Sequence, residues 1–241
     1  PYVISACLVG SEMCIRDRPN ILCGHSLGEY TALVAANSIS LEDAILLVHK
    51  RGILMEKCKK GSMCAILNVD KDIISKTCKQ IENKFNTIVA PANINSPKQI
   101  VISGTIIGVN QVVKHLTQSG YKKCIKLNVS VASHSRLMDE ISKDFRDELN
   151  EIDFNEPNCE VIHNVDNKSS SDIFDLKEKL LNQLTCPVQW TNTMNYIKKF
   201  NGIVIECGPN KILTGIAKSN GIKNIFSTSS KNFIDEIKEV L

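Results

Sequence analysis

Several features that mark membrane, secreted or nucleic-acid-binding proteins are missing from this sequence. No apolar run reaches the roughly 18 residues that a membrane-spanning helix needs. The ten cysteines include no Cys-x-x-Cys pair and no segment resembles a secretory signal, so we expect reduced thiols in a cytoplasmic protein. The net charge of +3 is too small to predict nucleic acid as a partner.

What the sequence does contain is ordinary for a globular protein. Hydrophobic residues make up 43% of the 241 residues and charged residues 23%, which argues against disorder. The length allows one large domain or two smaller ones.

Arginine is scarce except near the start of the chain. Residues 1–18 hold two of the five arginines, Arg16 and Arg18, and none of the 24 lysines. This shift in composition indicates a foreign origin, and the segment resembles an adapter-derived artefact at the end of a translated transcript. We therefore expect a non-native prefix and a true chain that begins upstream of Pro19. A natural N-terminal helix is the alternative.

The remaining residues alternate between expected strands and helices. Strands are expected at 20–24, 61–69, 87–92, 99–103, 122–127, near 161, at 202–206 and near 225. Turn residues Asn95, Ser96 and Pro97 are expected to join the third and fourth of these strands. The order βαββαβ over 61–127 is that of a ferredoxin-like unit, and the alternation elsewhere predicts a parallel sheet covered on both faces.

A pattern typical of serine nucleophiles follows the first expected strand. Residues 24–28, Gly-His-Ser-Leu-Gly, fit Gly-x-Ser-x-Gly between a strand and a helix, which is the context of a nucleophile elbow. Ser26 would project from the turn, where the helix dipole and the free Leu27 N–H can stabilise an oxyanion. The sequence therefore predicts a catalytic serine. A glycine-rich structural turn is the alternative.

A catalytic serine needs a base, and the chain contains five histidines. His134 is the preferred candidate because it follows an expected strand, in a loop of the kind where α/β folds place catalytic groups. His25 adjoins Ser26, so their side chains should point in different directions. His49 and His115 fall within expected helices. For His134, a structural loop histidine is the alternative.

Arg51 lies on the apolar side of an expected helix, together with Ala44, Val48 and Met55. A buried guanidinium without a partner is costly, so Arg51 should face an anion. That anion is either a carboxylate-bearing substrate held bidentately or an internal Asp or Glu.

Seven stretches together resemble the malonyl-CoA:acyl carrier protein transacylase family. They are GHSLGEYTAL (24–33), RGILM (51–55), ANINSPKQIVISG (92–104), VSVASHSRLM (129–138), NVD (164–166), CPVQWT (186–191) and ECGPNKILTG (206–215). The stretches follow one another in the family's order, and the resemblance extends over nearly everything after residue 19.

The resemblance implies a mechanism with a serine nucleophile and a histidine base, Ser26 and His134. A main-chain carbonyl rather than an acid would orient the histidine, at the position matched by Gln189. Residues implied to bind substrate are Arg51 as the clamp on the malonyl carboxylate, Leu27 as an oxyanion donor, Gln189, His25 and Asn95. No metal or cofactor is implied, and the partners would be malonyl-CoA and acyl carrier protein, with the chain a monomer that binds neither nucleic acid nor membrane.

The resemblance also implies an α/β-hydrolase-like subdomain, residues 19–60 and 128–241, with residues 61–127 as a ferredoxin-like insert. One departure is a missing glycine- and glutamine-rich loop that supplies the family's second oxyanion donor. Roughly 80 residues that should precede the elbow are absent, so we expect poor solubility and low activity of this chain.

Three readings of function remain open. The first is malonyl transfer in fatty acid biosynthesis, or in the setting of a polyketide synthase. The second is a serine hydrolase or thioesterase, which would favour an Asp or Glu partner for the histidine and an apolar acyl pocket. The third is a catalytically impaired fragment that still docks a carrier protein.

Overall fold

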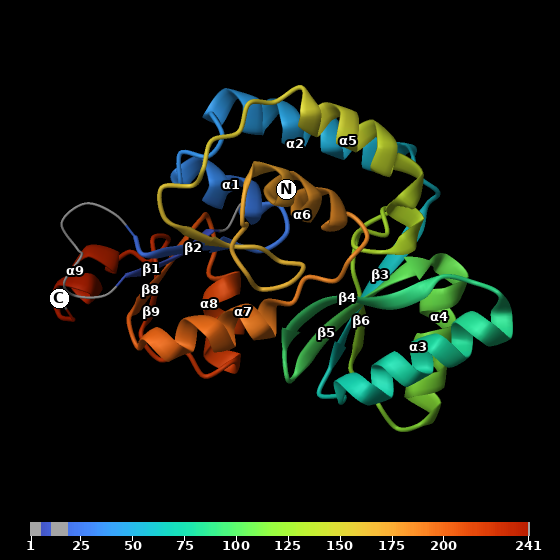
Figure 1. Cartoon of the computed structure of the whole chain (residues 1–241). Coiled ribbons are helices and arrows are strands. Elements are labelled where there is room, and N and C mark those ends of the chain that lie inside the picture. Colours follow the sequence, from blue (N-terminus) through green and yellow to red (C-terminus); the bar gives the residue numbers. More distant parts are fainter. Residues whose placement is uncertain (1–5, 11–18, 241) are drawn as a thin grey trace.

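The computed structural model describes the backbone of residues 6–10 and the backbone and side chains of residues 19–240. The chain forms a five-stranded sheet enclosed by helices and a smaller four-stranded sheet with its own helices (Figure 1). This is an α/β architecture in which the larger sheet is mixed and the smaller one antiparallel. Within the described residues, no helix combines the length and the apolar composition that crossing a membrane requires.

The larger sheet has the strand order β7-β2-β1-β8-β9. Its strands are β1 (Ala6–Gly10), β2 (Ile21–Gly24), β7 (Glu160–Ile162), β8 (Ile203–Cys207) and β9 (Ile225–Ser227). β2 is parallel to β7 and β8 to β9, but β1 is antiparallel to both neighbours, so the expectation of a parallel sheet is wrong at β1. Only the ten residues 11–20 separate β1 from β2, whereas a parallel pair needs a crossover of about a dozen or more.

The segment expected to be a non-native prefix, residues 1–18, lies mostly outside the described residues. Its residues 6–10 form β1, at the centre of the larger sheet. This part of the segment therefore contributes to the fold, although the sequence analysis left it out. Its non-native origin stays a prediction.

Helices cover both faces of the larger sheet (Figure 1). One face is covered by α1 (Gly28–Ala35), α2 (Leu41–Lys57), the 3₁₀ helix η2 (Arg136–Ile141), α5 (Ser142–Asn150) and α6 (Ile173–Asn182). The other face packs on α7 (Trp190–Ile197) and α8 (Ile212–Ser219). The 3₁₀ helix η3 (Lys198–Phe200) follows α7, and α9 (Phe233–Lys238) lies beside β9.

Strand β2 shows how the sequence produces two cores. Successive side chains of a strand point to opposite faces. Leu22 packs in the core beneath α1 and α2, whereas Ile21 and Cys23 pack in the core with α7 and α8. A strand buried on both faces reads as a continuous apolar run, as residues 21–23 do. This burial fixes where β2 ends, and the site residues follow directly after it.

The smaller sheet has the order β4-β5-β3-β6, with every neighbouring pair antiparallel. Its strands are β3 (Gly61–Leu67), β4 (Val89–Ser96), β5 (Gln99–Thr105) and β6 (Cys124–Lys126), and its helices are α3 (Lys71–Phe85) and α4 (Ile106–Gln118). The two helices pack on the sheet through a separate core.

Strand β4 is longer than the sequence predicts. Asn95 and Ser96 were expected in a turn, but both belong to β4, and only Pro97 and Lys98 separate β4 from β5. The pairing continues because an irregularity in register lies between Ile94 and Ser96. Asn95 therefore sits at the end of a buried strand instead of in a solvent-exposed turn.

Three helices begin at side-chain caps of the residue types that favour this position. The Ser40 hydroxyl accepts the Asp43 N–H at 3.0 Å, and the Asp70 carboxylate accepts the Asp72 N–H at 2.8 Å. Thr105 caps α4 by accepting the Gly108 N–H at 3.0 Å. Residues 136–150 form two successive helices, η2 and α5.

Backbone hydrogen bonds around Val188 join the smaller sheet to the segment that enters α7. The Val188 N–H donates to the Ala92 carbonyl at 2.8 Å, and the Val188 carbonyl accepts the Ile94 N–H at 2.8 Å. This parallel bridge holds the end of β4 against the segment that enters α7. It brings Asn95 to the edge of the site.

Candidate active site

Ser26 occupies a strained turn between β2 and α1. Its φ is +52°, in the left-handed region that a residue with a side chain rarely adopts. Gly24 makes the turn possible, because a Cβ at that position would lie 1.9 Å from the backbone of Gly28. Strand and helix therefore approach closely, as the Gly-x-Ser-x-Gly pattern predicts.

His134 meets Ser26 across 108 residues of sequence. The Ser26 Oγ lies 2.8 Å from His134 Nε2. His134 lies between β6 and η2, is 3% exposed, and also has a positive φ, +57°. The structure thus brings together the two residues that the sequence analysis paired.

The His134 ring is oriented from its far side by the carbonyl of Gln183. This oxygen lies 2.7 Å from His134 Nδ1, and because a carbonyl only accepts, Nδ1 carries the proton. Nε2 is then the free acceptor for the Ser26 hydroxyl. This arrangement can take the serine proton as Oγ attacks an electrophile.

The prediction that Gln189 supplies this carbonyl is wrong. The Gln189 oxygen instead accepts N–H groups of Asn192 and Thr193 at the start of α7. Gln183 reaches His134 because it directly follows α6, whose C-terminal end points at the site. The two glutamines are six residues apart, and no local sequence pattern distinguished them.

Burial keeps His134 in its neutral form. Desolvation is the main cause that lowers the pKa of His134 to about 3, and the positive charge of Arg51 lowers it further. The hydrogen bond to Gln183 acts in the opposite direction. The imidazole is therefore available as a proton acceptor throughout the physiological pH range.

Arg51 is a buried cation without a carboxylate partner among the described residues. It is 6% exposed, and no ion pair to Asp or Glu forms there. Its Nη2 donates to Gln183 Oε1 at 3.3 Å, its guanidinium lies 5.8 Å from the Tyr30 ring, and its Nε has no hydrogen-bond partner. No described Asp or Glu therefore forms the internal salt bridge that the sequence left open, and this part of the site retains a positive charge that an anion could neutralise.

The Leu27 N–H lies at the start of α1, directly after Ser26. No described residue accepts a hydrogen bond from it. A backbone donor at a helix N-terminus is placed to stabilise negative charge on an oxygen. Its position agrees with the oxyanion role expected from the sequence.

His25 and Asn95 also meet. His25 Nε2 lies 2.8 Å from Asn95 Oδ1, and its ring packs edge-on against Trp190 with centroids 5.2 Å apart. Burial lowers the pKa of His25, while the Asn95 contact raises it. His25 thus points toward Asn95 of the smaller sheet, whereas Ser26 Oγ points toward His134, as expected for neighbours on the turn. Trp190 is fully buried, as core packing predicts.

Comparison with known proteins assigns the family. Residues 11–230 match the acyl transferase domain. This chain belongs to the acyl transferase domain family.

Relatives of this acyl transferase domain have a common description. The malonyl CoA-acyl carrier protein transacylases of Haemophilus influenzae and Salmonella typhimurium are 37% and 38% identical over 205 residues, or 83% of this chain. The chain spans 65% of the length of each. The crystal structure of the Xanthomonas oryzae transacylase superposes with a TM-score of 0.88 at 33% identity, covering 92% of this chain and 72% of that one.

A hydrogen-bonded network next to Ser26 contains four residues that the sequence did not assign to the site. Asn164 and Gln183 bond the Ser26 backbone, and Glu29 links them to His163. Asn164 Oδ1 accepts the Ser26 N–H at 2.7 Å, and Asn164 Nδ2 donates to the Gly24 carbonyl at 2.7 Å. The clue in the sequence was a polar residue among apolar neighbours. Glu29 is the charged residue of α1, whereas Gln183 follows a helix, α6, that is itself rich in charged residues and gave no such clue.

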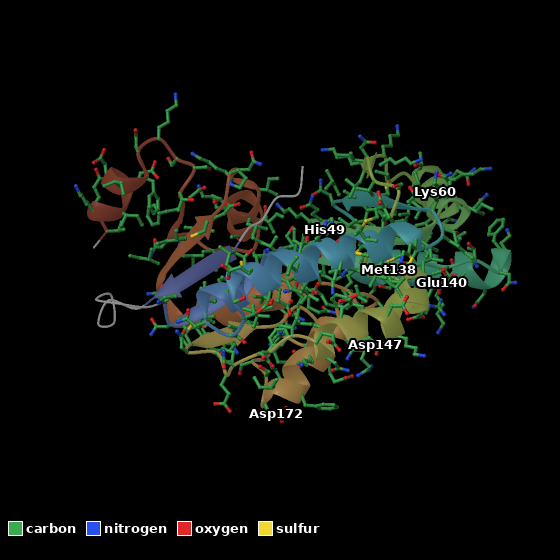
Figure 2. All side chains as sticks on the ribbon, turned by 90° about the horizontal axis from the view of Figure 1, so that it is seen from above. His49, Lys60, Met138, Glu140, Asp147 and Asp172 are labelled. Carbon is green, nitrogen blue, oxygen red and sulfur yellow. The ribbon has the colours of Figure 1, made fainter. Side chains whose placement is uncertain are left out.

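Two other histidines of the acyl transferase domain lie outside the site. His49 and His115 are exposed, on α2 and α4. Figure 2 looks down on the layer formed by α2 and α5, with His49 on its outer side. Both are surface residues of helices, as their place in expected helices allows.

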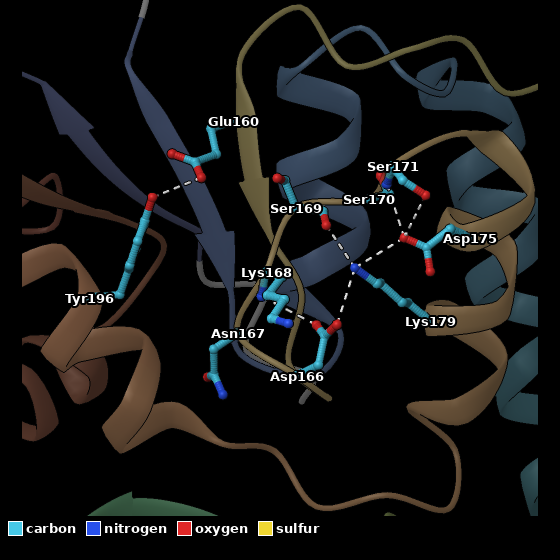
Figure 3. Close-up of a pocket in the computed structure, with 10 residues that line it drawn as sticks. All are labelled: Glu160, Asp166, Asn167, Lys168, Ser169, Ser170, Ser171, Asp175, Lys179 and Tyr196. Carbon is cyan, nitrogen blue, oxygen red and sulfur yellow. Dashed lines mark hydrogen bonds and ion pairs between the residues drawn. The ribbon is translucent and has the colours of Figure 1, made fainter.

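A polar pocket of about 530 Å³ lies over the loop between β7 and α6 (Figure 3). Ser26, His134 and Arg51 are not among its lining residues. Lys179 anchors the loop through Asp166 at 3.2 Å, Asp175 at 3.1 Å and the Ser169 carbonyl at 2.7 Å. These contacts hold the segment that carries Asn164.

Metal binding has no evident place in the part of the chain that the structure describes. No group of three or more His, Cys, Asp or Glu side chains there could hold a metal ion.

The thiols of Cys64 and Cys78 are buried, which raises their pKa to about 11 and about 12. These two cysteines are therefore unreactive core residues.

Proposed function

We propose that this acyl transferase domain moves a malonyl group from coenzyme A to the phosphopantetheine thiol of acyl carrier protein, in fatty acid biosynthesis. The observation that carries the proposal is the buried Arg51, which has no carboxylate partner among the described residues and is linked through Gln183 to the Ser26–His134 pair. Such a cation favours an acyl group that ends in a carboxylate. The names of the relatives support the same substrate.

The proposed reaction has two halves. Ser26 Oγ attacks the thioester carbonyl while His134 Nε2 takes its proton. The tetrahedral oxyanion is stabilised by the Leu27 N–H, and coenzyme A leaves as its thiol with the proton returned by His134. The carrier thiol then attacks the malonyl ester, giving its proton to His134, which passes it to Ser26. Arg51 holds the malonyl carboxylate throughout.

His134 acts in this proposal without a carboxylate partner. Its Nδ1 binds a main-chain carbonyl, whereas the nearby carboxylate of Glu29 binds His163 instead. The serine hydrolase alternative favours an acid on the histidine, so the contacts support transfer over hydrolysis. His25 and Asn95 are proposed to line the substrate site beside Ser26.

We also propose the division expected from the sequence, with residues 19–60 and 128–241 as the α/β-hydrolase-like acyltransferase part and 61–127 as a ferredoxin-like part. The antiparallel order β4-β5-β3-β6 and the elements β-α-β-β-α-β support the second part. One solved structure shows a type II polyketide synthase carrier protein in complex with its malonyl-transacylase, and the matched chain in it is 32% identical to this one. It supports a carrier protein as partner and keeps the polyketide setting as an alternative. A monomeric chain in the cytoplasm stays a prediction.

The test is single-turnover labelling with radioactive malonyl-CoA, followed by addition of carrier protein bearing phosphopantetheine. We expect label on Ser26 that moves to the carrier thiol, and no label on Ser26→Ala. Free malonate without carrier labelling would support a hydrolase. Carrier binding without any label would support a docking fragment, and either result would overturn the proposal.

A further inference from the structure

Glu29 carries a fully buried carboxylate beneath Ser26. It is the second residue of α1 and is 0% exposed. Burying a carboxylate is costly unless its oxygens are well hydrogen-bonded. Three donors meet it: His163 Nδ1 at 2.7 Å, the Asn164 N–H at 3.0 Å and Gln183 Nε2 at 2.8 Å.

Two of these donors belong to residues that hold the site. Asn164 accepts the Ser26 N–H, which secures the left-handed turn. The Gln183 carbonyl accepts His134 Nδ1–H, its Nε2 also donates to the Ser26 carbonyl at 3.1 Å, and its Oε1 accepts Arg51 Nη2. Among the described residues, the partners of the Glu29 carboxylate are His163, Asn164 and Gln183, and it makes no hydrogen bond to Ser26 Oγ, His134 or Arg51.

The chemistry of a carboxylate decides how the Gln183 amide is turned. An ionised carboxylate only accepts hydrogen bonds, so the amide must point its NH₂ at Glu29. Its oxygen then faces Arg51, which only donates. If the amide turned over, its NH₂ would face the guanidinium and its oxygen would face the carboxylate, so both contacts would be lost.

We propose that Glu29 is a positioning residue that sets the orientation of the Gln183 amide, and through it the aim of Arg51 and the alignment of Ser26 with His134. The part that concerns malonyl selectivity rests on the proposed function. The part that concerns Ser26 reactivity does not.

The variant that tests this is Glu29→Gln, which keeps size but removes the charge. A glutamine oxygen has two lone pairs for three donors, and its own NH₂ faces them, so at least one donor loses its acceptor. The Gln183 amide then loses the carboxylate that only accepts, and its orientation depends on its two remaining partners, the Ser26 carbonyl and Arg51. Glu29→Asp retains an acceptor-only group, and it should recover part of each property.

Glu206 provides a matched control elsewhere in the same sheet. It is also 0% exposed, and it accepts the N–H groups of Leu213 and Thr214 at 3.0 and 2.7 Å and the Thr214 hydroxyl at 2.5 Å. These contacts cap α8 and do not reach the site. Glu206→Gln therefore reports the general cost of removing a buried, hydrogen-bonded charge.

The first measurement is the rate at which a fluorophosphonate labels Ser26, a reaction in which Oγ displaces fluoride from phosphorus and does not need malonyl-CoA. Rates are normalised to the folded fraction from near-UV circular dichroism. We expect Glu29→Gln to slow labelling by about 10- to 100-fold, the usual cost of a misplaced reacting group, and Glu206→Gln to leave it unchanged. Equal rates in the two variants would overturn the positioning role.

The second measurement is the ratio of kcat/KM for malonyl-CoA and acetyl-CoA. We expect Glu29→Gln to lower this ratio, with partial recovery in Glu29→Asp, because only malonyl uses Arg51. A purely structural role would scale both substrates equally. If the wild-type chain transfers no malonyl group, the proposed function fails, while the labelling comparison still decides whether Glu29 positions Ser26.

Discussion

Ser26 and His134 share an uncommon backbone conformation at the point where their side chains meet. Their φ angles are +52° and +57°, and Oγ lies 2.8 Å from Nε2. Each residue lies at a sharp turn of the backbone, and its side chain projects from that turn toward the other. The pair is thus assembled from two strained turns, which the surrounding hydrogen bonds maintain.

The first prediction separates strain from chemistry at position 26. Ser26→Gly and Ser26→Ala should both abolish acyl-enzyme formation, because both remove Oγ. The free energy of unfolding in urea should be about 1 kcal/mol higher for Ser26→Gly than for Ser26→Ala, because glycine adopts the left-handed conformation without steric cost. Equal unfolding free energies would show that the turn is not strained.

The second prediction concerns the pH dependence of acylation. Because the folded-state pKa of His134 is about 3, the base stays neutral in mildly acid solution. The single-turnover rate should therefore remain level from about pH 8 to about pH 5, without the usual fall near the ordinary histidine pKa. A rate that halves near pH 6.5 would contradict the buried, neutral imidazole.

The third prediction concerns acid stability. The unfolded chain binds a proton at His134 near pH 6.5, whereas the folded chain does so only near pH 3. The contribution of His134 to stability is therefore complete above pH 6.5 and is lost as the pH falls toward 3. His134→Gln should reduce the loss of unfolding free energy between these pH values, measured by urea titration. An unchanged pH slope would count against the shift.

The fourth prediction concerns Arg51. Arg51→Ala should lower kcat/KM for malonyl-CoA by roughly 10²-fold, the cost of losing one partner of a buried charge pair. Acetyl-CoA should be affected much less because it carries no carboxylate. Arg51→Lys should rescue only in part, because lysine lacks the planar fork. Equal losses for both substrates would make Arg51 a structural residue.

The fifth prediction concerns the turn beneath Ser26. Asn164→Ala removes the acceptor of the Ser26 N–H and the donor to the Gly24 carbonyl. We expect a loss of about 1–3 kcal/mol in unfolding free energy, since buried groups lose their partners. Acylation should slow in the folded protein. Thermal unfolding together with single-turnover labelling measures both effects.

Local patterns in the sequence were enough to find Ser26, because a nucleophile elbow is encoded within five neighbouring residues. His134 could be selected by its place after a strand. The caps Ser40, Asp70 and Thr105 were equally local. In each case the contact or the turn follows from the residue type and its immediate neighbours.

Residues that act through the backbone or through burial were harder to predict. A main-chain carbonyl can come from any residue, so nothing in the sequence favoured Gln183 over Gln189. Glu29 read as an ordinary residue of the helix, since its three donors come from segments more than 130 residues away. The direction of β1 depends on which strands flank it in the sheet, and composition carries no such information.

The bridge at Val188 couples the smaller sheet to the site. Two reciprocal hydrogen bonds tie β4 to the segment entering α7, and each contributes about 1 kcal/mol net. Asn95 follows the bridged residue Ile94 and contacts His25, the neighbour of Ser26. A displacement of the smaller sheet is therefore transmitted through one short strand end to the turn that bears Ser26. Binding of a partner to the smaller sheet would therefore change the position of Ser26.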